Sequence, residues 1–323
     1  MVLRSMEVSL FFAGTAGSVP TARRGLPALL LRAGGDRVLF DCGEGTQQQL
    51  LRSVGLPDLD AIFLTHFHLD HWLGILGMVK TFDLRARERP LTVYGPPGLY
   101  GLIEAMRPII GRTGYPMHLQ ELEPHEEVVF EGYAIGAFPV EHRVSAYGYA
   151  LIEEDRPGRF DAEAARSLGV EEGPDFGRLQ RGEVVGGVRP EQVVGPTRPG
   201  RRIVISGDTR PCQTTEVYAH EADVLVHEAT FMEDERARAR ETGHSTAQQA
   251  AELARDAGVR VLALTHLSTR YFPRDIRAEA RAVFAATVAP RDFDAIDVPF
   301  PERGEPHLVK TEREPDPAAG PAG

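Results

Sequence analysis

Residues 65–71 of the chain read Thr-His-Phe-His-Leu-Asp-His, which places three histidines and an aspartate within six residues. The segment follows the apolar run Ala-Ile-Phe-Leu at residues 61–64, which predicts a buried strand. In α/β proteins, the end of a strand is a typical place for a binding site. Imidazole nitrogens and carboxylate oxygens suit Zn²⁺. The segment therefore predicts a metal site; the alternative is a run of exposed or core histidines.

The spacing within this segment predicts two adjacent ions. His66 and His68, as alternate residues on an extended end, reach one ion, whereas Asp70 and His71 on the following turn reach a second. Further ligands are expected at the ends of other apolar strands. Three positions qualify: His142, Asp208 and His266.

Seven candidate ligands then share two ions. His66, His68 and His142 are assigned to one ion, Asp70, His71 and His266 to the other, and Asp208 is assigned as a carboxylate bridge. This division leaves room for a bridging water whose pKa two cations lower toward neutrality. The cations also neutralise charge on a phosphoryl group undergoing displacement. The predicted chemistry is hydrolysis.

At this point the chain resembles a known family. The pattern His-x-His-x-Asp-His, followed by isolated His, Asp and His, resembles the metallo-β-lactamase superfamily, which implies a four-layer αββα sandwich. Within it the chain resembles ribonuclease Z. The segments that carry this likeness are residues 11–20 (FFAGTAGSVP), 40–47 (FDCGEGTQ), 94–98 (YGPPG), 206–209 (SGDT), 227–231 (HEATF), 243–246 (GHST) and 265–271 (THLSTRY), together with His142, Tyr147, Gly148 and Tyr149.

The resemblance implies a zinc-dependent endoribonuclease with two zinc ions per subunit. It would cut transfer RNA precursors just after the discriminator nucleotide, leaving a 3′-hydroxyl on the transfer RNA and a 5′-phosphate on the trailer. It further implies a homodimer in which the arm of one subunit clamps the transfer RNA cut by the other. Neither DNA nor a membrane is an expected partner.

Residues 154–194 resemble the flexible arm with which ribonuclease Z grips transfer RNA, and Gly173-Pro174 matches the Gly-Pro motif of that arm. The alternative is a polar insertion with a short helix at residues 161–168; loops this long are usually functional or disordered. Between Arg156 and Glu191 there are six Arg against seven Asp plus Glu, and the net charge of the chain is −11. This balance argues against non-specific nucleic-acid binding.

The resemblance also implies roles for single residues. Asp70 corresponds to the general base, and His244 to the proton donor for the leaving 3′-oxygen; alternatively His244 is a helix-terminal residue hydrogen-bonded to a ligand. His227 and Glu228 are expected to orient a ligand imidazole without touching the metal. Arg270 lies close enough to His266 in sequence to bind a substrate phosphate, the alternative being a surface salt bridge.

Two departures from the family pattern bear on these expectations. Many ribonuclease Z sequences carry Pro-x-Lys-x-Arg-Asn near the start, a loop associated with the response to a terminal CCA. Here residues 20–25 retain Arg24 but have Ala22 and Gly25 in place of Lys and Asn. Leu69 stands where the family usually has a small residue, and its side chain could narrow the mouth of the site.

Two rival functions stay open from the sequence. One is a hydrolase of the same fold that acts on a small phosphodiester or another ester, which the acidic charge and the altered loop favour. The other is a non-catalytic RNA-binding protein, which seven retained metal ligands disfavour. The chain is divided into a catalytic domain at residues 1–312, with the arm inserted, and a Pro/Gly/Ala tail at residues 313–323 expected to be disordered.

Compartment and local structure follow from simpler signals. Two cysteines, no signal peptide and no apolar run of about 20 residues favour the cytoplasm.

Strands are expected at residues 7–12, 28–33 and 37–40, the last two as an antiparallel pair. A helix with a buried face is expected at residues 72–82. A capping box at residues 245–248 predicts a helix through Ala257, with Gly258 as its stop and a strand at residues 259–264.

Overall fold

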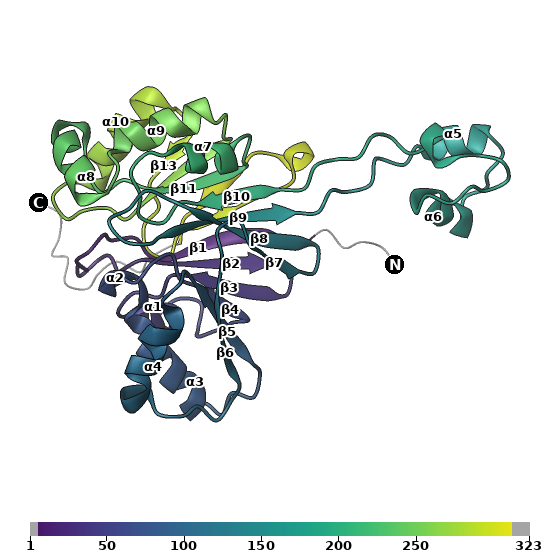
Figure 1. Cartoon of the computed structure of the whole chain (residues 1–323). Helices are drawn as coiled ribbons and strands as arrows, with labels where there is room; N and C mark the ends of the chain where they lie inside the picture. Colours follow the sequence, from purple (N-terminus) through teal and green to yellow (C-terminus); the bar gives the residue numbers. More distant parts are fainter. Residues whose placement is uncertain (1–5, 312–323) are drawn as a thin grey trace, which may run out of the picture.

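Two sheets packed face to face form the centre of the molecule (Figure 1). The computed structural model describes residues 6–311, and the tail predicted to be disordered lies outside them. Eight strands form the first sheet in the order β15-β14-β1-β2-β3-β4-β5-β6. Their bounds are β1 Val8–Gly14, β2 Ala28–Ala33, β3 Asp36–Phe40, β4 Ala61–Phe63, β5 Leu91–Gly95, β6 Met117–Glu121, β14 Ala295–Asp297 and β15 His307–Val309.

The second sheet has seven strands in the order β13-β12-β11-β10-β9-β8-β7. Strands β10 to β13 run parallel, whereas β7 to β10 pair antiparallel. Their bounds are β7 Glu127–Phe130, β8 Tyr133–Pro139, β9 Tyr147–Glu153, β10 Arg202–Ile205, β11 Val224–Glu228, β12 Val261–Thr265 and β13 Thr287–Val288.

Helices cover the outer face of each sheet (Figure 1). The first sheet carries α1 Thr46–Leu51, α2 Leu69–Trp72, α3 Gly74–Leu84 and α4 Leu99–Ile110. Beside the second lie α7 Gln213–Ala219, α8 Arg236–Thr242, α9 Ala247–Asp256 and α10 Pro273–Val283, with the short 3₁₀ turns η2 Glu233–Glu235 and η3 Pro301–Arg303. Within residues 6–311, no helix combines the length and apolar character needed to cross a membrane.

Three apolar layers explain why the central strands read as continuous apolar runs. In β2, Leu29 and Leu31 pack between the sheets, whereas Leu30 packs under the helices of the first sheet. A third cluster lies under the helices of the second sheet. A strand buried on both faces needs apolar residues at every position. The layers confirm the αββα class expected from the sequence.

Several local expectations are confirmed, with two differences. The hairpin of β2 and β3 forms, pairing Ala33 with Asp36. The capping box at α9 is also present, but Thr246 exchanges hydrogen bonds with Gln249, three residues on, and not with Gln248. The helix expected at residues 72–82 forms as α3 at residues 74–84, whereas Trp72 ends the separate short helix α2. The amide of Gly74 donates to the carbonyl of Cys42 at 2.9 Å, which takes it out of a regular helical pattern.

The segment between β9 and β10 leaves the sandwich as a stalk and ends in a small helical head (Figure 1). The head contains α5 Ala162–Ser167, α6 Pro174–Gln180 and the 3₁₀ turn η1 Pro190–Gln192. Asp161 caps α5 by accepting from the amides of Glu163 and Ala164. The head has its own apolar cluster, which includes Leu179 and Val193 and shares no residue with the three sandwich clusters.

This separation predicts independent stability of the arm head. Leu179→Ala should destabilise the head by about 2–4 kcal/mol, because it leaves a cavity in a small core. Limited proteolysis should then cut the arm faster, while the thermal unfolding midpoint of the sandwich stays unchanged. Leu151→Ala, in the layer between the sheets, should lower that midpoint. If both variants lowered the thermal unfolding midpoint equally, arm and sandwich would unfold as one unit.

Candidate metal centre

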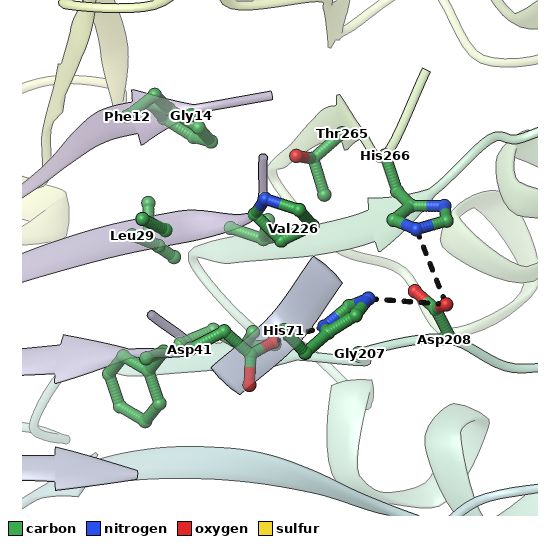
Figure 2. Close-up of a pocket in the computed structure, with 14 residues that line it drawn as sticks. Phe12, Gly14, Leu29, Asp41, His71, Gly207, Asp208, Val226, Thr265 and His266 are labelled. Carbon is green, nitrogen blue, oxygen red and sulfur yellow. Dashed lines mark hydrogen bonds and ion pairs between the residues drawn. The ribbon is translucent and has the colours of Figure 1, made fainter. Parts of the chain in front are cut away.

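The ends of strands from both sheets bring the candidate ligands together. From the first sheet, β4 leads into the segment of His66 and His68, and His68 immediately precedes α2. From the second sheet, the chain leaves β8, β10 and β12 just before the other three positions: His142, Asp208 and His266. Figure 2 shows His71, Asp208 and His266 converging, with dashed contacts between the carboxylate and both imidazoles.

The first group consists of His66, His68, His142 and Asp208, whose ligand atoms all lie within 4.8 Å of one another. Nε2 of His66 is 2.9 Å from Nδ1 of His68, and that Nδ1 is 3.2 Å from Nε2 of His142. Oδ2 of Asp208 lies 3.8 Å from Nε2 of His66. Two Nε2 atoms, one Nδ1 atom and a carboxylate oxygen therefore face a common point.

The second group consists of Asp70, His71 and His266. Oδ2 of Asp70 lies 3.6 Å from Nε2 of His71 and 3.3 Å from Nε2 of His266. Oδ2 of Asp208 lies 3.3 Å from each of these two nitrogens. Asp208 thus lies between the two groups, the place predicted for the bridging carboxylate.

Hydrogen bonds at the far side of each ring fix the tautomers of two imidazoles. Nδ1 of His71 lies 2.7 Å from the carboxylate of Asp41, which can only accept. The hydroxyl of Thr65 lies 3.0 and 3.1 Å from the two Asp41 oxygens and 3.0 Å from Nδ1 of His66. Because the hydroxyl proton is used on Asp41, its oxygen accepts from His66. Both rings therefore carry the proton on Nδ1 and direct Nε2 to the centre.

The other two Nε2 ligands are oriented in the same way. Nδ1 of His142 is 2.7 Å from the backbone carbonyl of Gly243, which is an acceptor. The hydroxyl of Thr230 donates to Glu228 at 2.6 Å and lies 2.8 Å from Nδ1 of His266, from which it therefore accepts. Outer contacts of this kind are typical of metal-binding histidines.

The donor set fits a pair of divalent cations. Nε2 of His71 is buried and, within residues 6–311, has no hydrogen-bond partner. Burial opposes charge on His71, but Asp208 and Asp41 raise the pKa of its imidazole well above the usual value. Burial also opposes the charge of Asp208 and so raises its pKa, but His266 and His71 hold this pKa well below its usual range. The field that favours a proton on His71 also favours a metal cation in its place.

His244 lies at the edge of this centre and is held protonated. Its Nδ1 is 2.8 Å from Oε1 of Glu228 and 3.9 Å from Oδ2 of Asp208. Burial lowers the pKa of the imidazole, but the charge and hydrogen bond of Glu228 outweigh it and raise the pKa to about 9. An imidazolium beside the metal groups can donate a proton at neutral pH.

Glu228 connects His244 to the second group. Its Oε1 also accepts from the amide of Thr209 at 2.9 Å, and its Oε2 accepts from the hydroxyl of Thr230, which contacts His266. By contrast, Nδ1 of His227 lies 2.8 Å from the carbonyl of Glu228, and the described residues offer its buried Nε2 no partner. Glu228 is therefore placed to orient a ligand imidazole, whereas His227 contacts only backbone.

Within residues 6–311, no hydrogen bond or ion pair joins the predicted substrate residues to the candidate ligands. Nη1 of Arg270 lies 3.0 and 3.1 Å from the two carboxylate oxygens of Glu235 on the surface. Gly173 and Pro174 lie at the start of α6 in the arm head, away from α2 (Figure 1). Leu69, which stands where the family usually has a small residue, has 64% of its surface exposed.

Sequence reasoning missed several contributors to the site, among them Thr65 and Gly243, which contact His66 and His142. Asp41 and Thr230 orient ligand imidazoles, and the amide of Ser18 donates to Oδ2 of Asp70 at 3.0 Å. Ser18 lies in the loop that contains Arg24, whose guanidinium donates to the hydroxyl of Thr15 and to the carbonyl of Pro290. Each missed residue lies in a segment quoted for the resemblance or beside one; the available signal was position next to a strand end.

Comparisons with known proteins agree with this geometry. The family model of the metallo-beta-lactamase superfamily matches residues 25–266. Ribonuclease Z of Myxococcus xanthus is 48% identical over 302 residues, covering 91% of this chain and 98% of that relative. Ribonuclease Z of Haloferax volcanii is 46% identical over 306 residues, covering 91% and 96%.

A solved structure agrees as well. The short form of human tRNase Z is similar at a TM-score of 0.67 and 27% identity, with 90% of this chain and 99% of that chain covered. The chain therefore belongs to the metallo-beta-lactamase superfamily and, within it, to the ribonuclease Z family.

Proposed function

We propose that the chain is a zinc-dependent endoribonuclease that removes the 3′ trailer from transfer RNA precursors by phosphodiester hydrolysis. The observation that carries the proposal is the clustering of His and Asp side chains that could hold metal ions, with His244, whose pKa is raised to about 9, at the edge of the cluster. Relatives named ribonuclease Z, at 48% and 46% identity over most of the chain, support the same reaction.

The metal assignment follows from the donor atoms. One zinc ion would be held by His66, His68 and His142, the other by Asp70, His71 and His266, with Asp208 bridging the two. When bound, the two ions would supply Lewis-acid activation of water and neutralise charge on the phosphoryl group.

The protein groups then carry the protons. Water attacks phosphorus while the bond from phosphorus to the 3′-oxygen breaks. Asp70 accepts the proton of the attacking water, because its carboxylate is ionised; burial opposes this charge, but the contacts with the imidazoles of His266 and His71 lower the pKa of Asp70. His244 donates a proton to the leaving 3′-oxygen. The products are a 3′-hydroxyl on the transfer RNA and a 5′-phosphate on the trailer.

The arm is proposed to hold the body of the transfer RNA. Its Arg166, Arg178 and Arg181 are paired with carboxylates of the arm itself. Among the described residues, Arg159 and Arg189 are exposed and form no ion pair. These two arginines, together with the Gly173-Pro174 turn, are proposed to contact the RNA, with the arginines binding phosphate despite the slight acidic excess of the arm.

Arg270 is proposed to bind a substrate phosphate on the sandwich. It would have to exchange the carboxylate of Glu235 for that phosphate, and because this ion pair is exposed its loss costs little.

We further propose a homodimer in the cytoplasm. In Figure 1 the arm extends away from the end of the sandwich that carries α2. This direction favours an arrangement in which the arm holds a transfer RNA bound at the centre of a second subunit. The buried, unpaired Cys42 and Cys212 suit a reducing compartment.

A hydrolase of small phosphodiesters is the alternative. The net charge of −11 and the replacement of Lys and Asn by Ala22 and Gly25 in the loop of residues 20–25 favour it. Under this alternative, the arm plays no part in the reaction.

Zinc should bind with a stoichiometry of two. Trp72 is the only tryptophan, is buried, and directly follows His71, so its fluorescence should change as zinc is added to chelator-stripped protein. The change should saturate at two equivalents. Asp208→Ala should weaken binding by about tenfold or more, because both groups lose a ligand; Asp58→Ala, on the surface, should not. Saturation at one equivalent would contradict the proposal.

The pH profile should report the Glu228–His244 pair. Activity on a small chromogenic diester should fall as pH rises through about 9, because His244 then loses the proton that it donates. Glu228→Gln removes the charge that raises this pKa, so the alkaline limb should move to lower pH, toward about 6.5. Glu252→Gln, on the exposed side of α9, serves as the control. An unchanged limb in Glu228→Gln would remove His244 from the role of acid.

Removing the arm head should separate the two functions. Residues 160–194 can be replaced by a two-glycine turn, because Arg159 and Gly195 are already joined by a 2.9 Å backbone hydrogen bond. Cleavage of an end-labelled precursor should fall by about a hundredfold or more, with small-diester hydrolysis little changed. Asp70→Ala should abolish both activities. Equal losses on both substrates after arm removal would contradict the arm's role.

A further inference from the structure

The root of the arm is narrow and closely packed. Arg156 and Arg198 exchange backbone hydrogen bonds of 2.8 and 2.9 Å across the two segments of the stalk. The segments approach so closely at Gly158 that a Cβ there would lie 1.8 Å from the carbonyl oxygen of Gly195. The outgoing and returning segments therefore leave the sandwich as one unit, and the direction of this unit is set where it emerges.

A carboxylate from the C-terminal part of the chain binds both segments at this point. Glu302, in η3, accepts from Arg156 at 2.7 and 3.2 Å, on the outgoing segment. It also accepts from Nη1 of Arg198 at 2.7 Å, on the returning segment. One side chain thus connects both segments of the stalk to an element that belongs to neither.

The same cluster is anchored in the sandwich by an aromatic ring. The guanidinium carbon of Arg156 lies 3.5 Å from the ring centroid of Phe300, and that of Arg201 lies 4.0 Å from it. Phe300 is buried, and Arg201 forms a buried ion pair with Glu153 at the end of β9. Contacts therefore run without a break from the core to the stalk.

Isolated surface ion pairs contribute little, but this cluster joins three charged side chains, and Glu302 accepts from Arg156 through both carboxylate oxygens. The side chains of Arg156, Glu302 and Arg198 expose 17%, 24% and 34% of their surfaces. Hydrogen bonding from Arg156 lowers the pKa of Glu302 to about 2, although burial opposes the shift. Glu302 is thus ionised throughout the physiological range.

We propose that Glu302 is a positioning residue that fixes the direction of the arm, and thereby the position at which the arm meets precursor transfer RNA. The inference rests on the function proposed above. The apolar cluster of the arm head includes no residue of the sandwich, so this cluster does not hold the head against the sandwich. The position of the head is therefore set by the contacts at the root of the arm. A small rotation at the root moves the head through a larger arc. Binding of an extended RNA then depends on Glu302, whereas the chemistry at the metal centre does not.

The test compares Glu302→Gln with Glu305→Gln in the zinc-loaded full-length protein. Glu305 lies on the same segment and pairs with Arg260, away from the stalk. Glu302→Gln should raise KM for an end-labelled precursor by about tenfold with little change in kcat. Hydrolysis of bis(p-nitrophenyl) phosphate should stay within about twofold. Glu305→Gln should match the unmodified chain on both substrates.

Arg198→Met provides a second variant that removes the same contact from the other side. It should raise the precursor KM similarly. In the double variant Glu302→Gln/Arg198→Met, the fold-increase in KM should be smaller than the product of the two single fold-increases, as expected for residues in one network. Equal losses on both substrates, or an unchanged precursor KM, would overturn the inference. Failure of the unmodified chain to cut the precursor is a distinct result that would overturn the proposed function as well.

Discussion

A carboxylate buried among imidazoles is the constraint on which the rest of the site depends. A buried charge is costly unless it is paired or bound to a metal. Oδ2 of Asp208 lies 3.3 Å from the Nε2 atoms of His71 and His266 and 3.8 Å from that of His66. The outer contacts of Asp41, Thr65, Thr230 and Gly243 make sense in this setting, because each engages the Nδ1 atom of an imidazole and leaves its Nε2 atom directed toward the shared centre.

Local patterns explain how far the fold could be predicted. The pair β2 and β3 and the helix α9 follow from short-range signals: an apolar run, a tight turn and a capping residue. The division of α2 from α3 does not follow from such signals. It depends on the amide of Gly74 reaching the carbonyl of Cys42, a contact between segments that periodicity alone cannot reveal. The close approach is available only because Gly74 has no side chain: a Cβ there would lie 2.0 Å from the carbonyl oxygen of Gly43.

The candidate site shows the same division. His and Asp at strand ends could be recognised one by one, and the spacing of the ligand residues divided them into two groups before any resemblance was considered. The partners of those residues could not be recognised, because Asp41 is thirty positions from His71 and Thr230 is thirty-six from His266. Arg270 illustrates the converse: its guanidinium, expected at a substrate phosphate, pairs with Glu235 here. Its role as a phosphate ligand stays a prediction.

Each metal group takes residues from both sheets. His66, His68, Asp70 and His71 follow β4 of the first sheet, whereas His142, Asp208 and His266 follow strands of the second. A cation bound by either group would therefore act as a cross-link between the two halves of the sandwich, in addition to any part in catalysis. Binding and folding then become thermodynamically linked, since a ligand that binds only the assembled state stabilises it. The supply of metal would then govern the lifetime of the folded sandwich as well as the rate of catalysis.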